Sequence, residues 1–241
     1  MMRRHWRHKY SVLLIAILLL LAAHGRILEF AATALVCDQR LPQGDTIAIV
    51  SGDGRFDFAA QAVAEDRAQR ILLFEDGFRW LVQIGALPPG HEIDQQHLVT
   101  RNVHQDQIEL LAGPVTNHWD RAVRLTGWLD QHADGSILLL CDRFESRRVR
   151  SILDQVLPES KSERVRIVGL ADRRFDETNW WQSRTGVKSF VDAMLALLHS
   201  YAVGLPPPVK SNSWDPVEYE RRLGGEVRGQ KSEVRGQKLG T

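Results

Sequence analysis

The sequence predicts an α/β domain with a Rossmann-like parallel sheet flanked by helices, and three observations carry this prediction. Short apolar runs typical of buried strands alternate with helical patterns from residue 45 to residue 203. The first apolar run ends in a glycine-containing turn that leads into a helical pattern. An uncharged apolar segment precedes this region, and a polar repeat follows it. The chain therefore divides into an N-terminal segment, one domain at 37–205 and a C-terminal tail.

The N-terminal segment has the pattern of a membrane-targeting sequence. Ser11–Ala23 carries no charged residue, residues 1–10 are basic, and no acidic residue precedes Glu29. We expect residues 1–10 to be a cytoplasmic end and residues 11–32 a membrane anchor, with a signal peptide cleaved near Ala23-His24-Gly25 as the alternative. The apolar continuation through Ala32 favours the anchor. In both cases the positive-inside rule sends the domain across the membrane.

The domain carries four clear strand patterns and four clear helical patterns. Strands are expected at 45–51, 71–74, 136–140 and 164–170, and helices at 56–67, 117–131, 147–157 and 186–203. A short helix is expected through Trp80 and Ile84. Apolar residues in 90–112 follow neither the helical period nor the strand period well. We expect a strand near Leu98–Thr100 and a helical turn over Asp106–Leu111. After residue 206 the motif Glu-Val-Arg-Gly-Gln-Lys occurs twice with almost no apolar side chains, so 206–241 is expected to be disordered.

Composition narrows the classes of partner. The formal charge is only +1, which gives no electrostatic reason to expect nucleic acid. Two cysteines are too few for a disulfide scaffold. Cys141 ends an apolar run and is expected to be a buried thiol, with a bridge to Cys37 as the alternative in an exported domain. The spacing of histidine, cysteine and acidic residues matches no metal site, so neither a metal nor a cofactor is predicted.

Candidate binding residues follow the predicted strands, because ligands of parallel sheets bind at the carboxyl ends of the strands. Gly52, Asp53, Gly54 and Arg55 follow the first strand, where backbone N–H groups can approach an anion and an arginine adds charge-assisted hydrogen bonds. The alternative is an ordinary turn with a solvated arginine. The basic cluster containing Arg148 either clamps a phosphate or carboxylate, or pairs with neighbouring acids on a solvated helix face.

The candidate catalytic residues are His118, Asp120 and Glu145. A histidine can act as a general base near neutral pH, and a carboxylate can orient it. His118 and Asp120 are two positions apart on a helix and point to different sides, so His118 would instead meet Glu145 or Asp53 from another strand end. The alternative is an exposed histidine without a catalytic role. Whether the chain is an enzyme stays open.

In the order of its motifs the chain resembles the domain of unknown function 218 family, the SanA/ElyC/YdcF-like bacterial envelope proteins. The resemblance spans roughly residues 10–203 and rests on four blocks: the apolar segment with 45–55, Asn117–Ala122, Cys141–Arg148, and Asn179-Trp180-Trp181 before Gly186. It implies a Rossmann-like domain held in the periplasm by a single inner-membrane helix. It also implies a role in cell-envelope or peptidoglycan biogenesis, with an anionic small molecule or a lipid-linked precursor as ligand and hydrolysis as a candidate activity.

The resemblance also bears on individual residues. Arg148 matches the family arginine, and Asn179 with Trp180 would form a wall of the pocket, unless the tryptophans cover the sheet edge or touch the membrane interface. The chain departs from the family pattern elsewhere: His118 stands at a usual threonine, Asp120 at a usual glutamate and Glu145 at a usual histidine. The alternative function is therefore a non-catalytic binding or scaffolding module. A nucleotide or S-adenosylmethionine binder is a third reading.

Overall fold

The computed structural model describes residues 23–37, 39, 46–49, 53–76, 82 and 85–203. The predicted cytoplasmic end, the first half of the predicted anchor, Gly52, most of the short helix through Trp80 and the whole C-terminal tail lie outside the described residues. The predictions for these segments stay predictions.

Five parallel strands form one sheet in the order β3-β2-β1-β4-β5. Their bounds are β1 Thr46–Ile49, β2 Arg70–Asp76, β3 Ile108–Val115, β4 Ile137–Asp142 and β5 Val165–Leu170. The order reverses at β1, which pairs with β2 on one side and with β4 on the other. This reversal is the point at which Rossmann-like sheets bind ligands. It confirms the predicted parallel α/β architecture.

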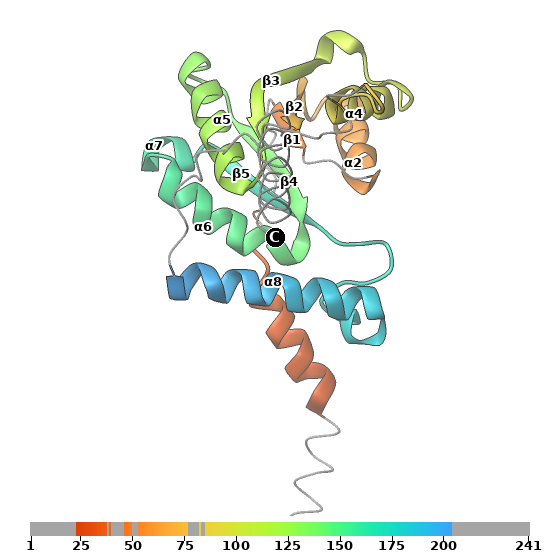
Figure 1. Ribbon diagram of the computed structural model, residues 1–241, viewed down its shortest axis with the longest axis vertical. Helices are drawn as coiled ribbons and strands as arrows, with labels where there is room; N and C mark the ends of the chain where they lie inside the picture. The colour runs from red at the N-terminus through yellow and green to blue at the C-terminus, as the bar shows by residue number, and fades with distance from the viewer. Residues whose placement is uncertain are drawn as a thin grey trace, which may run out of the picture. The chain divides into compact units, whose positions relative to one another are not determined.

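Helices cover both faces of the sheet (Figure 1). Side chains alternate between the faces along each strand, so Ala48 packs with α5 and α6 whereas Ile47 and Ile49 pack with α2 and α4. The helices are α2 Asp53–Ala64, α4 Gly90–Val99, α5 His118–Gln131, α6 Ser146–Val156, α7 Glu159–Ser162 and α8 Arg184–Val203, with short 3₁₀ turns η1 Gln105–Gln107, η2 Arg143–Glu145 and η3 Trp180–Gln182.

The predictions for residues 90–112 are wrong except at Asp106 and Gln107, which lie in the 3₁₀ turn η1, Gln105–Gln107. Leu98 lies in α4 rather than in a strand, and Ile108 begins β3 rather than a helical turn. In α4 only Leu98 is buried, so the helix leaves almost no apolar period in the sequence. In β3 the alternation is blurred because Leu110 is exposed and Pro114 interrupts the run. A proline is tolerated there because β3 is an edge strand.

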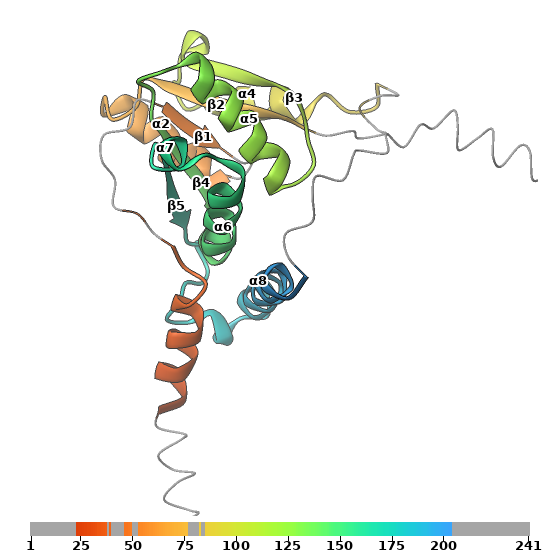
Figure 2. The same cartoon turned by 90° about the vertical axis from the view of Figure 1, so that its left-hand side faces the viewer.

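A third apolar cluster lies apart from the two faces of the sheet. It joins α8 to a helix at 23–33 and to the turns after β4 and β5. Trp180 stacks on Phe190 with ring centroids 3.8 Å apart, and its Nε1 donates a hydrogen bond to the carbonyl of Leu28 at 3.2 Å. Figure 2 shows α8 and the 23–33 helix together on one side of the sheet. Within the described part of the chain, no helix is long and apolar enough to cross a membrane.

Candidate functional site

A polar cavity of about 480 Å³ lies at the carboxyl edge of the sheet, beside the reversal point. We call it the strand-end cavity. The first turn of α2, the start of α5, the end of β4 and the following turns supply its lining, which consists of Arg55, Thr116, Asn117, His118, Arg121, Cys141, Asp142, Glu145 and Arg148. Four predicted site residues, Arg55, His118, Glu145 and Arg148, therefore meet in one place although they come from separate parts of the chain.

Arg55 is buried at the junction of β1 and β4. Only 9% of the residue is exposed, and its guanidinium lies 2.5 Å from the carboxylate of Asp142. A buried charge requires a counter-ion, and Asp142 is placed to provide one because β1 and β4 are neighbours that end at the same edge. The first turn of α2 therefore directs Arg55 inward, not into solvent.

His118 is held from both sides by charged side chains. Arg121 Nη1 lies 3.0 Å from His118 Nδ1, and Glu145 Oε2 lies 3.3 Å from His118 Nε2. A guanidinium can only donate, so Nδ1 accepts and the ring proton sits on Nε2, directed at the carboxylate. This assignment makes His118 a neutral imidazole whose two nitrogens are both engaged. It can act as a base only after Arg121 is drawn away from Nδ1, the nitrogen that carries the free lone pair.

Glu145 is the acidic centre of the strand-end cavity. The hydrogen bond from His118 holds the pKa of Glu145 below its ordinary value despite burial, and the nearby charges of Arg148 and Arg55 act in the same direction. Glu145 is therefore ionised at neutral pH. It is a fixed negative charge that orients His118 and neutralises part of the surrounding positive charge.

Arginines outnumber carboxylates among the described residues that line the strand-end cavity. Three arginines, Arg55, Arg121 and Arg148, line it together with two carboxylates, Asp142 and Glu145. In addition, the Nε atom of Arg148 is buried and has no hydrogen-bond partner in the part of the chain that the structure describes. A buried donor without a partner is costly. The arrangement fits an anion that would accept a hydrogen bond from Arg148.

Asp120 does not belong to this charge network. Its carboxylate accepts hydrogen bonds from the backbone N–H of Thr116 at 2.9 Å and from the Thr116 hydroxyl at 2.7 Å. Its own backbone N–H donates to the side chain of Asn117 at 2.9 Å, which caps the N-terminus of α5. The structure thus separates Asp120 from His118, as the helical spacing predicts, and gives Asp120 a role in shaping the turn.

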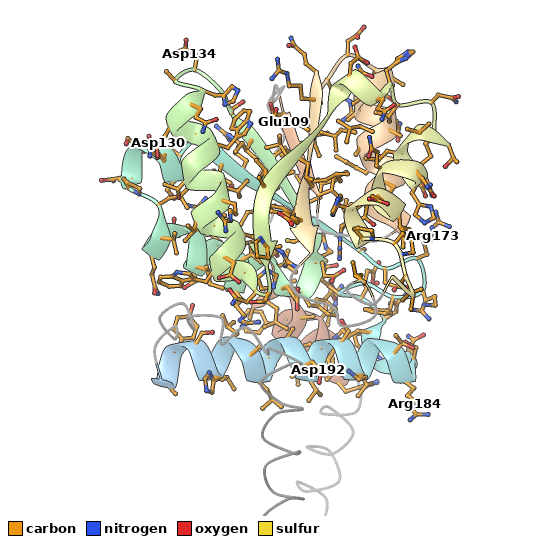
Figure 3. The ribbon with its side chains drawn as sticks, turned by 45° about the horizontal axis from the view of Figure 1, so that its top comes forward. Glu109, Asp130, Asp134, Arg173, Arg184 and Asp192 are labelled. Carbon is orange, nitrogen blue, oxygen red and sulfur yellow. The ribbon has the colours of Figure 1, made fainter. Side chains whose placement is uncertain are left out.

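A second cavity of about 400 Å³ adjoins the first. Arg55 and Asp142 line both cavities, whereas the charged residues Asp172, Arg173 and Arg174, together with Gly54, line only the second. Asp53 begins α2. Arg174 pairs with Asp172, and Arg173 pairs with Asp57 at the surface, on the side of α2 and α4 (Figure 3). The same view shows Glu109 of β3, Asp130 of α5 and Asp134 of the turn after α5 on the side of the domain away from α8.

Asn179 and Trp180 lie away from the lining of the strand-end cavity. The Asn179 side chain accepts a hydrogen bond from the backbone of Asp176 at 2.8 Å, and Trp180 is only 6% exposed within the third apolar cluster. Trp180 therefore packs between α8 and the 23–33 helix, and the residues that line the strand-end cavity do not include it. The effect of Asn179 and Trp180 on a ligand would pass through η2, which carries both Phe144 of that cluster and Glu145 of the cavity.

Cys141 lines the strand-end cavity but is 2% exposed, and burial raises the pKa of its thiol to about 12. It is therefore a packed thiol, not a nucleophile, and both cysteines are free. Among the described residues no group of three histidine, cysteine or acidic side chains could hold a metal ion.

Sequence reasoning missed Arg121 and Asp142 as site residues. Arg121 lies three positions after His118 on a predicted helix, so their contact was available from spacing. The partnership of Asp142 with Arg55 depends on β4 lying beside β1, and strand order leaves no local pattern in a sequence. Comparison of the chain with protein-family models, curated proteins and solved structures finds no match.

Proposed function

We propose that the chain is a membrane-anchored extracytoplasmic α/β protein that binds an anionic ligand in the strand-end cavity. The observation that carries the proposal is the Nε of Arg148, which lines an arginine-rich cavity, is buried and has no hydrogen-bond partner among the described residues. Phosphate and carboxylate are the groups that arginines bind with matching geometry. The uncharged Ser11–Ala23 segment and the basic residues before it support the anchor and its orientation.

The resemblance in motif order supports placing this activity in cell-envelope or peptidoglycan biogenesis at the bacterial inner membrane. A lipid-linked precursor carries a phosphate next to its lipid, which meets the charge requirement of the strand-end cavity. Hydrolysis of a phosphoester is the candidate reaction. An anion bound to Arg121 would release Nδ1 of His118, which could then take a proton from the attacking water while Glu145 stabilises the charged imidazole.

Binding is tested with inorganic phosphate and pyrophosphate on the full chain in detergent. The full chain is required because Ala32 and Leu35 are buried in the third apolar cluster, so a truncation at residue 37 would expose that cluster. Arg148→Met should weaken binding by about 10- to 100-fold, the range for a hydrogen bond to a charged group. Arg184→Met removes the same charge from the start of α8 and should leave the affinity unchanged. Equal affinities in all three proteins would reject the proposed site.

The second candidate function is a non-catalytic binding or scaffolding module. It is favoured by His118, whose two nitrogens are both engaged, and by Cys141, whose thiol is buried. Phosphoester hydrolysis that disappears in His118→Gln while phosphate binding persists would support the enzyme. Binding without hydrolysis in the unmodified chain would support the module, and the absence of anion binding would count against both.

A further inference from the structure

Helix α8 carries an apolar face that the domain does not cover. Val187, Val191, Leu195, Leu198 and Tyr201 are between 38% and 67% exposed. They follow one another at intervals of four and three residues and therefore share one side of the helix. We call these five residues the outer apolar face.

The other sides of α8 have different surroundings. Ala193 and Leu197 are buried, and Phe190 and Met194 pack against the third apolar cluster. Lys188 and Asp192 pair with each other at the surface and give the helix a polar side. Figure 3 shows Asp192 directed away from the sheet. A helix on the surface of a soluble domain usually has one apolar side, which faces the core, whereas α8 has two.

The helix at 23–33 places this face relative to the N-terminal segment. It is joined to the same cluster by the hydrogen bond from Trp180 to Leu28 and by the burial of Ala32. Its outward side chains are also apolar, with Ile27 54% and Phe30 77% exposed. In Figures 1 and 2 the N-terminal end of this helix points away from the sheet, and α8 lies across it.

We propose that the outer apolar face, together with Ile27 and Phe30, lies on the surface of a lipid bilayer, so that α8 is an interfacial helix. The inference rests on the proposed membrane anchoring. The sequence that leads into residue 23 is the uncharged Ser11–Ala22, so a chain anchored there enters the bilayer along the 23–33 helix. Because α8 lies across that helix, it would run along the membrane plane, as amphipathic interfacial helices do.

The anchor also explains why a bilayer is the occupant of this face. A chain held by its N-terminal segment keeps α8 beside lipid continuously, and tethering raises the effective concentration of lipid around the face. The contact would fix the orientation of the domain, because α8 packs against Phe144 in η2, next to Glu145 of the strand-end cavity. The carboxyl edge of the sheet, and with it the arginines, would then face the headgroup region.

The test is spin-label accessibility in the full chain, reconstituted in vesicles of phosphatidylethanolamine and phosphatidylglycerol. Labels are placed at Val191, Leu195 and Leu198, and matched controls at Lys188 and Asp192, in a Cys37→Ser background. Buried Cys141 does not need replacement. Outer-face labels should collide more with oxygen, which is enriched in lipid, and less with a water-soluble nickel complex than the controls do. Equal accessibility on both sides of α8 would overturn the proposal.

A label at Ile15 separates this inference from the proposed anchoring. If the Ile15 label does not enter the bilayer, the anchoring itself fails. If it enters while the outer-face labels remain open to nickel, only the interfacial helix fails. Outer-face labels shielded from both oxygen and nickel would show a protein contact instead: dipolar broadening would identify a second copy, and its absence a segment of the same chain. Either result overturns the proposal.

A pair of charge variants gives an independent measurement. Leu195→Glu combined with Leu198→Glu should lift the outer apolar face from the lipid and expose a label at Val191 to nickel. Lys188→Glu combined with His199→Glu introduces acidic groups on the polar side and should leave that label protected. If both pairs leave the Val191 label unchanged, the outer apolar face does not rest on lipid.

Discussion

At the scale of the residue, the strand-end cavity is governed by how each charge is compensated. Arg55 is compensated by Asp142, and His118 is held between Arg121 and Glu145. Arg148 contributes a buried Nε that has no hydrogen-bond partner among residues 23–37, 39, 46–49, 53–76, 82 and 85–203. A ligand anion would therefore complete the network rather than replace a contact within it, which is why Arg148 is the sharpest single test of binding.

The pairing of Glu145 with His118 predicts a pH-dependent contribution to stability. The pKa of Glu145 lies below its ordinary value of 4.5 in the folded protein, so folding favours the ionised form. The resulting stabilisation is fully present above pH 4.5 and is lost as the pH falls through the folded-state pKa. Glu145→Gln should lower the free energy of unfolding by about 1 kcal/mol at neutral pH, the net contribution of a typical hydrogen bond.

The measurement is urea unfolding of Glu145→Gln and the unmodified chain at neutral pH and again well below pH 4.5. The difference between the two proteins should shrink at the lower pH, because Glu145 is then protonated in both states. Asp134→Asn, at the far edge of the sheet, serves as the control and should change the free energy by less than about 0.5 kcal/mol. A difference that is independent of pH would contradict the pairing.

Sequence reasoning reached four residues of this cavity but not their contacts. Arg55, His118, Glu145 and Arg148 carry chemistry that is visible in a sequence. Arg55, Glu145 and Arg148 follow predicted strand ends, and His118 begins a predicted helix. Which of them touch is decided by β4 lying beside β1, and this adjacency comes from the packing of the whole sheet. The burial of Trp180 could not be predicted from the sequence either. A tryptophan that packs in a core and one that lines a pocket have no local difference in sequence.

At the scale of the element, long periodic segments were predictable and weakly periodic ones were not. The helix at 117–131 and the strand at 164–170 lie within one or two residues of α5 and β5. Their apolar side chains repeat at the period of the element because one side faces a core. Helix α4 buries only Leu98, and edge strand β3 exposes Leu110, so neither imposes a period that the sequence could display.

Replacing either of two helical glycines by alanine should change the stability of the protein, in opposite directions. Gly127 lies exposed in α5, and a Cβ there would meet nothing within 4 Å, so Gly127→Ala should stabilise the protein by about 0.5–1 kcal/mol. At Gly186 in the first turn of α8, a Cβ would overlap the carbonyl oxygen of Trp180 and lie 2.9 Å from the Ser183 hydroxyl. Gly186→Ala should therefore destabilise by about 1–3 kcal/mol. Urea midpoints measure both changes, and equal shifts would contradict the packing of α8 on η3.

At the scale of the whole molecule, three apolar clusters divide the described structure. Two lie on opposite faces of the sheet, and the third joins α8, the 23–33 helix and the turns after β4 and β5. The third cluster shares no buried residue with the other two. It can therefore open without loss of the sheet core, in the way that cooperative units of a protein open separately. Such a unit would couple contact with the membrane to the turn that carries Glu145.

Trp180→Ala tests this division in the full chain by hydrogen exchange. Removing the indole deletes its stacking on Phe190 and its hydrogen bond to Leu28, a change that costs about 3–5 kcal/mol in a packed site. Amides of the 23–33 helix and α8 should exchange faster, while those of β1 and β2 keep their protection. Trp128 belongs to α5 and is buried against the sheet. Trp128→Ala is the matched control and should speed exchange in the sheet. If Trp180→Ala loosens β1 and β2 as much as Trp128→Ala does, α8 and the 23–33 helix are part of a single cooperative domain and could not reorient on a membrane independently of it.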